Sequence, residues 1–197
     1  ALAYSSIVLA SGGSPAGLGS GTVVLVTGVC PVPASGVGSV ALNVTVTNPS
    51  SASFLTVYPT GTTRPTASNL NVVPGQTVPN MVIVPVGSNG RVSIFNQSGT
   101  ADVVVDVLGW FPSGGGFTGV TPARLADTRN LPTIDGRVTN TGPVGAAAKL
   151  TVPIAGRGGV PSNATAVALN VTATGATAGT YLTVFPTGKQ RPTASNL

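Results

Sequence analysis

Few side chains in this sequence could do acid–base or metal chemistry. The 197 residues include four Asp, no Glu and no His, whereas general acid–base catalysis relies on His or on a carboxyl group with a tuned pKa. Asp102 and Asp106 would lie on one face of a strand, where they could act as paired carboxylates or hold a cation. Ca²⁺ needs about six to eight oxygen ligands, however, and no Asp-rich loop supplies them. We expect one of the two to pair with Arg64 or Arg91, and we expect no catalytic residue, metal or cofactor.

A second group of polar residues, Asp127-Thr128-Arg129, has the form of a functional triplet. Asp and Thr side chains also hydrogen-bond the local backbone in turns, and an Arg nearby can pair with a carboxylate. We therefore predict a structural role for Asp127 and Arg129. Cys30 is the only cysteine, so no disulfide can form within the chain, and we expect it to be a small buried apolar residue.

The heptapeptide RPTASNL occurs twice without change, at residues 64–70 and 191–197. Such identity indicates a fixed network of backbone and side chains, and Arg191 and Asn196 would belong to the network of the second copy. A sugar site is the alternative, because carbohydrate is held by polar groups together with a stacking aromatic ring. The residues that could form such a site are Arg64, Asn69, Tyr58 and Trp110.

These heptapeptides end a longer internal repeat. Residues 40–70 and 167–197 align without gaps, match at 20 of 31 positions and lie 127 residues apart. Such self-similarity is typical of tandem repeat architectures. The first copy continues to about Pro112, while no residues of the sequence correspond to that continuation after Leu197. We expect a second unit that is incomplete, either because a longer array continues or because strands of a neighbour complete it.

Alternation of apolar and polar residues predicts strands. In the first copy Val40, Leu42, Val44 and Val46 alternate with smaller or polar residues, and the second copy repeats the pattern. Asn89-Gly90 between two apolar runs predicts a hairpin. Gly and Pro interrupt every window that is long enough for a helix. The predicted strands are 22–27, 40–47, 54–58, 81–86, 91–95, 102–111, 149–154, 167–174 and 180–185.

Short strands with regular turns indicate an all-β fold, an antiparallel β-sandwich of jelly-roll or immunoglobulin-like type. We predict a first sandwich unit over residues 1–112, a Gly-rich linker over 113–116 and a second, partial unit over 117–197. Burial of the Val, Leu and Ile faces would supply the core.

Charged residues are scarce and are absent from nearly the whole first third of the chain. Charged residues make up 7% of the chain, and no Lys, Arg, Asp or Glu occurs before Arg64. The net charge of +5 comes from single, scattered basic residues, whereas nucleic-acid binding needs a basic patch. No apolar run approaches the ~18 residues of a membrane span. A neutral surface of small polar residues favours close packing between proteins, and we expect a mature secreted protein from which any signal peptide has been removed.

Three segments resemble one family. They are RPTASNLNVVPGQTVPNMVIVPVGSNGRVSIFNQSG, DVVVDVLGWF and TPARLADTR. Together they resemble tandem β-rich modules of secreted actinobacterial and related bacterial surface proteins, which carry ASNLN, DVxGYF-like and LDTR-like segments. The resemblance covers nearly all of the chain beyond about Leu25 and implies an extracellular or cell-surface location. Some members of that family carry Cys at the positions of Thr60 and Ser93, which implies a disulfide in those members that this sequence lacks.

We therefore expect a structural module rather than an enzyme. It would associate with itself as a subunit or segment of a filament, sheath or surface array. A different class of function stays open: a carbohydrate-binding or adhesion module that attaches a secreted enzyme or a cell to a wall or matrix glycan.

Overall fold

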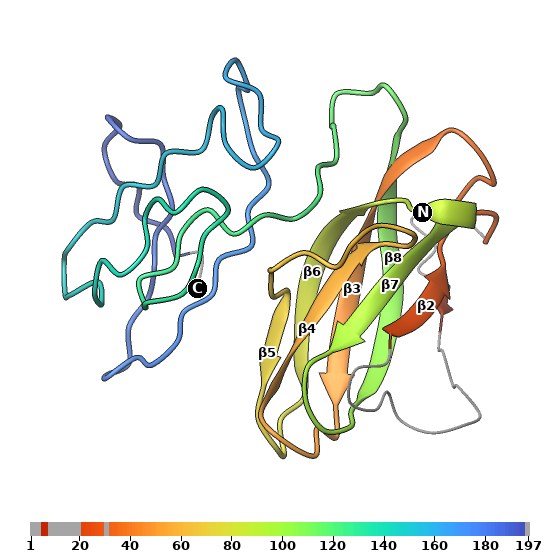
Figure 1. The fold of residues 1–197 in the computed structure, drawn as a ribbon, viewed down its shortest axis with the longest axis horizontal. Helices are drawn as coiled ribbons and strands as arrows, with labels where there is room; N and C mark the ends of the chain where they lie inside the picture. Colours follow the sequence, from red (N-terminus) through yellow and green to blue (C-terminus); the bar gives the residue numbers. More distant parts are fainter. Residues whose placement is uncertain (1–4, 8–20, 30–31, 196–197) are drawn as a thin grey trace.

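The computed structural model describes residues 5–7, 21–29 and 32–195, and its regular structure is β (Figure 1). Two four-stranded antiparallel sheets, with the orders β1-β8-β3-β6 and β2-β7-β4-β5, form a β-sandwich. This architecture confirms the predicted all-β class. None of the helical segments in the described residues could cross a membrane. The strands are β1 (Ser5–Ile7), β2 (Gly21–Leu25), β3 (Val37–Thr47), β4 (Ser53–Pro59), β5 (Leu70–Val72), β6 (Val78–Pro85), β7 (Arg91–Asn96) and β8 (Asp102–Pro112).

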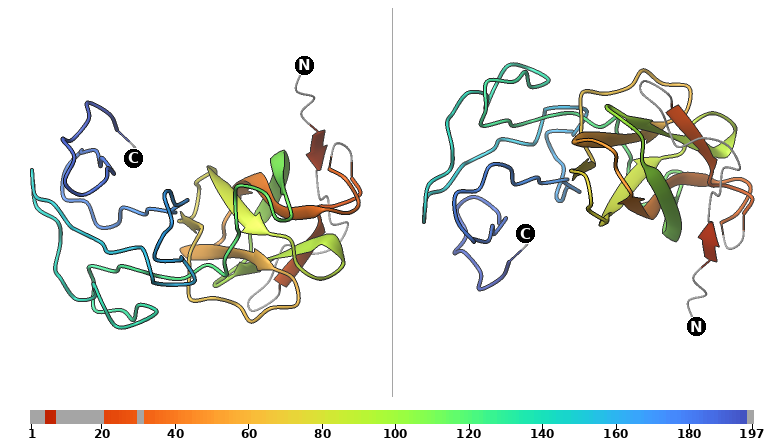
Figure 2. Two further views of the ribbon diagram at one scale, coloured as in Figure 1. Left: turned by 90° about the horizontal axis from the view of Figure 1, so that it is seen from above. Right: turned by 90° about the horizontal axis from the view of Figure 1, so that it is seen from below.

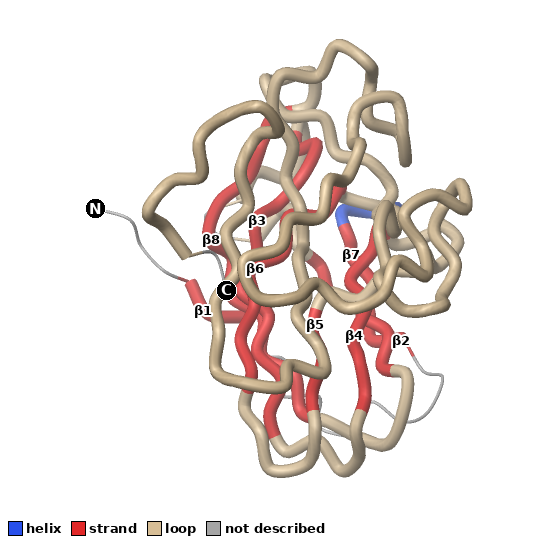
Figure 3. Tube along the Cα trace, turned by 90° about the vertical axis from the view of Figure 1, so that its left-hand side faces the viewer, coloured by secondary structure: helices blue, strands red, loops and turns tan. Residues whose placement is uncertain are grey.

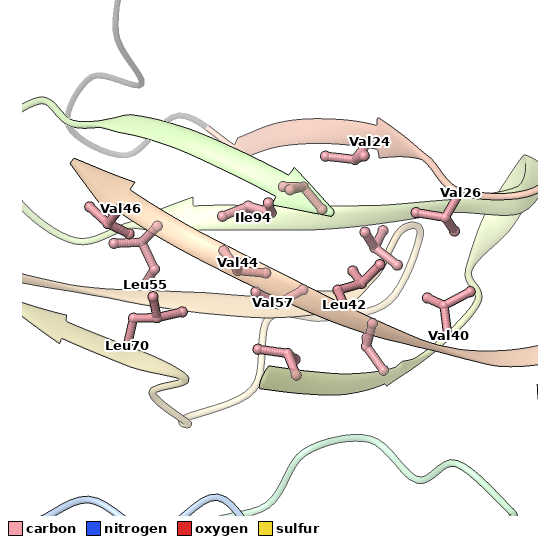
Figure 4. Close-up of a cluster of buried hydrophobic side chains, with 14 of the residues drawn as sticks. Val24, Val26, Val40, Leu42, Val44, Val46, Leu55, Val57, Leu70 and Ile94 are labelled. Atoms are coloured by element: carbon pink, nitrogen blue, oxygen red, sulfur yellow. The ribbon is translucent and has the colours of Figure 1, made fainter. Parts of the chain in front are cut away.

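The core lies between the two sheets and follows from the alternation in the sequence (Figure 4). Along β3, Val40, Leu42, Val44 and Val46 are fully buried, and Leu55 of the other sheet is also 0% exposed. Burial of each such side chain contributes roughly 1.5–3 kcal/mol relative to exposure. A row of branched aliphatic residues on one face therefore specifies which side of β3 turns inward.

Six of the predicted strands between residues 22 and 111 are present, with ends shifted by a few residues. Two strands were missed, β1 and β5, and each has three residues and lies at the edge of its sheet. So short a run holds too little alternation to be recognised. Cys30 lies outside the described residues, so its predicted burial stays a prediction.

The turn at Asn89-Gly90 forms, but it does not close a hairpin between neighbouring strands. Asn89 and Gly90 have φ values of 56° and 70°, the left-handed region that Asn and Gly tolerate best. They belong to the 3₁₀ turn Ser88–Gly90, which joins β6 of one sheet to β7 of the other. The predicted hairpin is therefore wrong: the tight turn serves as a corner between the sheets.

Beyond β8 the chain folds without strands, as Figures 2 and 3 show. Between residues 113 and 195 the structure has no strand, and Asp127 and Thr139 form one isolated bridge. The strands predicted at 149–154, 167–174 and 180–185 are wrong for this chain. A strand needs a partner for its backbone N–H and C=O groups, and no described segment pairs with these three.

The strandless segment is anchored where it leaves the sandwich. The rings of Phe111 and Phe117 stack with their centroids 4.7 Å apart. Gly119 lies so close to Pro85 and Ser39 that an added Cβ would come within 2.6 Å of each side chain. The Gly-rich residues 113–116 thus connect two parts that touch each other directly.

Candidate functional site

The second repeat exposes the apolar residues that the first repeat buries. Val167, Leu169 and Val171 are 42%, 46% and 37% exposed, whereas their counterparts Val40, Leu42 and Val44 are 0% exposed. The two sets belong to the same VALNV sequence, 127 residues apart. Solvent contact of such aliphatic surface costs roughly 25 cal/mol per Å² relative to burial. We call the exposed row Val167, Leu169 and Val171 the open face.

The first repeat shows what covers such a face. Strand β3 lies between β6 and β8, so that Leu42 is in register with Val82 on one side and Val107 on the other. The second sheet lies beneath, with Leu55 and Val57 in the core. Described residues 113–195 supply none of these partners to the second repeat. The open face has the residue types of a sandwich core without its neighbouring strands.

A corner of backbone has the same hydrogen bond in both repeats. Thr56 Oγ1 donates to the carbonyl oxygen of Ala67 (2.5 Å), and Thr183 Oγ1 donates to that of Ala194 (2.6 Å). In the first repeat the side-chain oxygen of Asn69 also accepts from the backbone N–H of Val57 (2.7 Å). The shared RPTASNL segment therefore contains a backbone corner, in which Asn69 has a structural role.

The second repeat touches the first through asparagine side chains. Asn170 Nδ2 donates to the carbonyl oxygen of Ser68 (2.7 Å), and Asn80 Nδ2 donates to Asn170 Oδ1 (3.0 Å). Asn80 Nδ2 also donates to the carbonyl oxygen of Asn69 (2.6 Å), which links β6 of one sheet to the residue before β5 of the other. We call the contact of Asn170 with Ser68 and Asn80 the internal joint. It covers the edge of the sandwich formed by β5 and β6.

The four residues predicted for a sugar site do not gather on one sheet. Tyr58 lies on β4, whereas Trp110, which is 39% exposed, lies on β8 of the other sheet. The guanidinium of Arg64 lies 4.0 Å from the centre of the Phe95 ring, so it occupies a ring face that a sugar could have used. The structure thus places Arg64 and Asn69 near β4 and separates Trp110 from them by the thickness of the sandwich.

Asp102 and Asp106 have amide partners rather than cations. Asp102 accepts from Asn48 Nδ2 (2.8 Å) and Asp106 accepts from Asn43 Nδ2 (3.5 Å). The ion pairs of the described residues include neither carboxylate. The predicted pairing with Arg64 or Arg91 is therefore wrong, because Arg64 stacks on an aromatic ring instead. No group of three metal-ligating His, Cys, Asp or Glu occurs in the described part of the chain.

Asp127 is the centre of a small ion cluster. Arg129 contacts it with Nε (2.9 Å), Nη2 (2.9 Å) and its own backbone N–H (3.0 Å), and Arg124 Nη1 adds a fourth bond (3.1 Å). The Arg129 hydrogen bonds hold the pKa of Asp127 below its ordinary value, against the opposing effect of burial. The same partner raises the pKa of Arg129. The triplet closes a turn, and both oxygens of the Asp127 carboxylate accept hydrogen bonds from Arg124 or Arg129.

A second cluster was missed by sequence reasoning. Arg157, only 5% exposed, donates to Asp135 through Nε (2.6 Å) and Nη2 (2.7 Å) and to the carbonyl oxygens of Pro153 (2.5 Å) and Leu125 (2.9 Å). Hydrogen bonds from Arg157 hold the pKa of Asp135 far below its usual range. The sequence feature that could have predicted this buried Arg is its place in the glycine-rich run 156–159, since glycines let the backbone pack closely around a guanidinium.

Beside this cluster lies an open groove of about 500 Å³. Its walls are mostly apolar and come from two chain segments and one side chain between them. The lining residues are Val120, Thr121, Pro122, Ala123, Ile134, Gly158 and Gly159.

Arg191 is exposed and takes part in no ion pair among the described residues. Asn196 lies outside them, so its predicted role stays a prediction.

Thr60 and Ser93 lie together, and their hydroxyl oxygens are 2.9 Å apart. These are the two positions at which the resemblance described above implies Cys, and here a hydrogen bond joins them. No family model matches the chain, and no curated protein matches it.

Proposed function

We propose that this chain is an extracellular structural repeat module that associates with copies of itself in a filament, sheath or surface array. The open face carries the proposal. Val167, Leu169 and Val171 are between 37% and 46% exposed, and a chain buries such a row when it finds partner strands. Addition of strands from a neighbour satisfies the backbone and the apolar side chains together.

The strand order indicates which partners are missing. Strands β1 and β8, β2 and β7, β3 and β6, and β4 and β5 pair with each other, as in one long hairpin whose two arms are rolled up together. We infer a jelly roll from this pairing. Residues 167–195 then correspond to β3, β4 and the corner that follows them. Counterparts of β5 to β8 would complete a second roll, and either chain that continues the array or strands of a neighbouring copy would supply them.

The scarcity of charged side chains agrees with a structural protein that assembles with copies of itself. Residues 1–63 carry no charged side chain, so little repulsion keeps copies apart. The carboxylates Asp127 and Asp135 are engaged by Arg side chains, which leaves them unsuited to acid–base work. The family resemblance and the lack of charge in residues 1–63 support an extracellular or cell-surface location for the module.

The test is the state of association of the purified chain and of one pair of variants. Val171→Lys places a charge on the open face, whereas Thr172→Lys places the same charge on the next residue, whose counterpart Thr45 alternates with the core residues of β3. We expect the wild type and Thr172→Lys to form particles larger than one chain in sedimentation and electron microscopy. Val171→Lys should remain monomeric. Monomers for the wild type at all concentrations would overturn the proposal.

The second candidate is a carbohydrate-binding or adhesion module. One observation favours it: Trp110 on β8 is 39% exposed, so its ring is accessible to stack on a sugar. A monomer whose melting temperature rises with one polysaccharide in a saturable manner would support this function instead.

A further inference from the structure

Two of the three residues of the internal joint, Asn170 and Ser68, have a counterpart in the other repeat. Asn170, which donates to the carbonyl oxygen of Ser68, is the counterpart of Asn43 in the first repeat. Ser68, within RPTASNL, is the counterpart of Ser195 in the second. Within the chain, Asn170 of the second repeat contacts the RPTASNL segment of the first repeat. The counterparts of these two are Asn43 on the first repeat and the RPTASNL segment of the second repeat, and they form a second set of the same two surfaces.

The surface around Asn43 has the exposure of a contact surface. Asn43 lies on β3 in register with Met81 of β6 and Asp106 of β8. Met81 is 60% exposed, and Leu108, two residues beyond Asp106, is 40% exposed. Two large apolar side chains thus flank the amide on the outer side of the sheet. Such rows of apolar residues with polar groups between them are typical of protein–protein contacts.

Charge distinguishes the two surfaces. On the sheet that carries Asn43, Asp102 and Asp106 accept hydrogen bonds from Asn48 and Asn43 and form no ion pair among the described residues. The segment that contains the second RPTASNL carries Lys189 and Arg191. The described residues 189–195 are all exposed, and these two cations form no ion pair there either. Two carboxylates on one surface match two cations on the other.

We infer that the outer surface around Asn43 of one copy docks on residues 189–195 of a second copy, with Asp102 and Asp106 facing Lys189 and Arg191. This inference rests on the proposed self-association and names one contact within it. The mode of contact repeats the internal joint, in which an Asn of VALNV donates to a carbonyl oxygen of RPTASNL.

Such a contact joins two different surfaces of the same chain. A heterologous, head-to-tail interface closes into a ring or continues as an open filament, according to the rotation between copies. The charge match favours contact between the two different surfaces, because contact between two copies of the same surface would place like charges together. Head-to-tail growth therefore needs no protein other than further copies of this chain.

A charge exchange in the full chain tests the contact. Asp106→Arg and Arg191→Asp, each alone, should lower the association constant at least about tenfold in sedimentation at low salt. The double variant Asp106→Arg/Arg191→Asp should recover most of that loss. Arg91→Asp, a change of the same kind at an exposed Arg of the other sheet, is the matched control and should associate like the wild type.

Crosslinking between copies gives a readout independent of affinity. In a Cys30→Ser background, chains with Asn43→Cys are mixed with chains with Ser195→Cys and oxidised. A mixed disulfide dimer is expected, whereas Val23→Cys, 49% exposed on the other sheet, should give none with Ser195→Cys.

Three outcomes are distinct. Recovery by the double variant together with the mixed dimer supports the contact. Association that is unaffected by the charge changes and gives no mixed dimer overturns it, while the proposed self-association stands. Absence of association by the unmodified chain overturns both.

Discussion

Thr183 and Ala194 hold the same backbone corner in the strandless second repeat that Thr56 and Ala67 hold inside the sandwich. The hydroxyl-to-carbonyl distances are 2.6 Å and 2.5 Å. One corner is packed between strands and the other is exposed, so the corner does not depend on the sheet around it. It is a local structure of the shared sequence, on which pairing can build.

The first prediction concerns that hydrogen bond. Thr56 is fully buried, so Thr56→Val leaves the carbonyl oxygen of Ala67 without its donor and should lower the free energy of unfolding by about 1–3 kcal/mol. Thr183→Val is the matched control, because water can reach the exposed Ala194 carbonyl. Urea unfolding followed by circular dichroism measures both. Equal losses for the two variants would contradict the dependence on burial.

The second prediction compares matched core positions. Leu42→Ala should lower the free energy of unfolding of the sandwich by about 2–5 kcal/mol, because it creates a cavity in a fully buried site. Leu169→Ala removes the same atoms from a side chain that is 46% exposed, and in the monomer it should change stability by less than about 0.5 kcal/mol. Denaturant midpoints at low protein concentration measure the difference. A large loss for Leu169→Ala in the monomer would mean that the open face is already buried.

The third prediction uses the contact between Thr60 and Ser93. With their hydroxyl oxygens 2.9 Å apart, Thr60→Cys/Ser93→Cys in a Cys30→Ser background should oxidise to a disulfide. The bridge closes a loop of over thirty residues and should raise the free energy of unfolding by about 3–4 kcal/mol in the chain-entropy model. The reduced form of the same variant is the control. Failure to oxidise in the native state would show that the two backbones are too far apart for a bridge.

The fourth prediction concerns pH. Hydrogen bonds from Arg129 lower the pKa of Asp127, and those from Arg157 lower the pKa of Asp135. Each ion pair therefore stabilises the fold above the unfolded-state pKa of about 3.9, and the stabilisation is lost as the pH falls through the lower folded-state value.

Nuclear magnetic resonance of the Arg129 backbone amide reports the protonation of Asp127 directly, because this amide donates a hydrogen bond to Asp127 Oδ1. Its chemical shift should be constant from pH 7 to about pH 4 and change only below that. Asp127→Asn should abolish the transition. A midpoint above pH 4 in the wild type would contradict the lowered pKa.

The fifth prediction completes the second repeat within one chain. A second copy of residues 71–112, fused after Leu197, supplies counterparts of β5 to β8. The fused chain should gain β-sheet signal in circular dichroism and lose self-association, because its own strands cover the open face. A fused segment with the same composition in scrambled order is the control. Unchanged association of the completed chain would show that copies meet elsewhere.

Much of the sandwich was readable from the sequence because its signals are local. The alternation at Val40, Leu42 and Val44 specifies a strand and its inner face, and Asn89-Gly90 specifies a turn that needs positive φ. The partners of charged side chains were not readable. Asp106 accepts a hydrogen bond from an amide, and Arg157 is buried, because residues distant in the sequence surround them. The spacing of residues along the sequence does not predict such neighbours.

The internal repeat separates the two kinds of information most directly. The sequence alone determined that residues 40–46 and 167–173 share one alternation and that both repeats end in the same corner. Tertiary structure decided that the first became β3 and the second stayed unpaired, because a strand exists only when its N–H and C=O groups find a neighbour. Strands β6 and β8 provide that neighbour for Leu42, whereas Leu169 has none in the described chain and keeps its apolar side chain exposed.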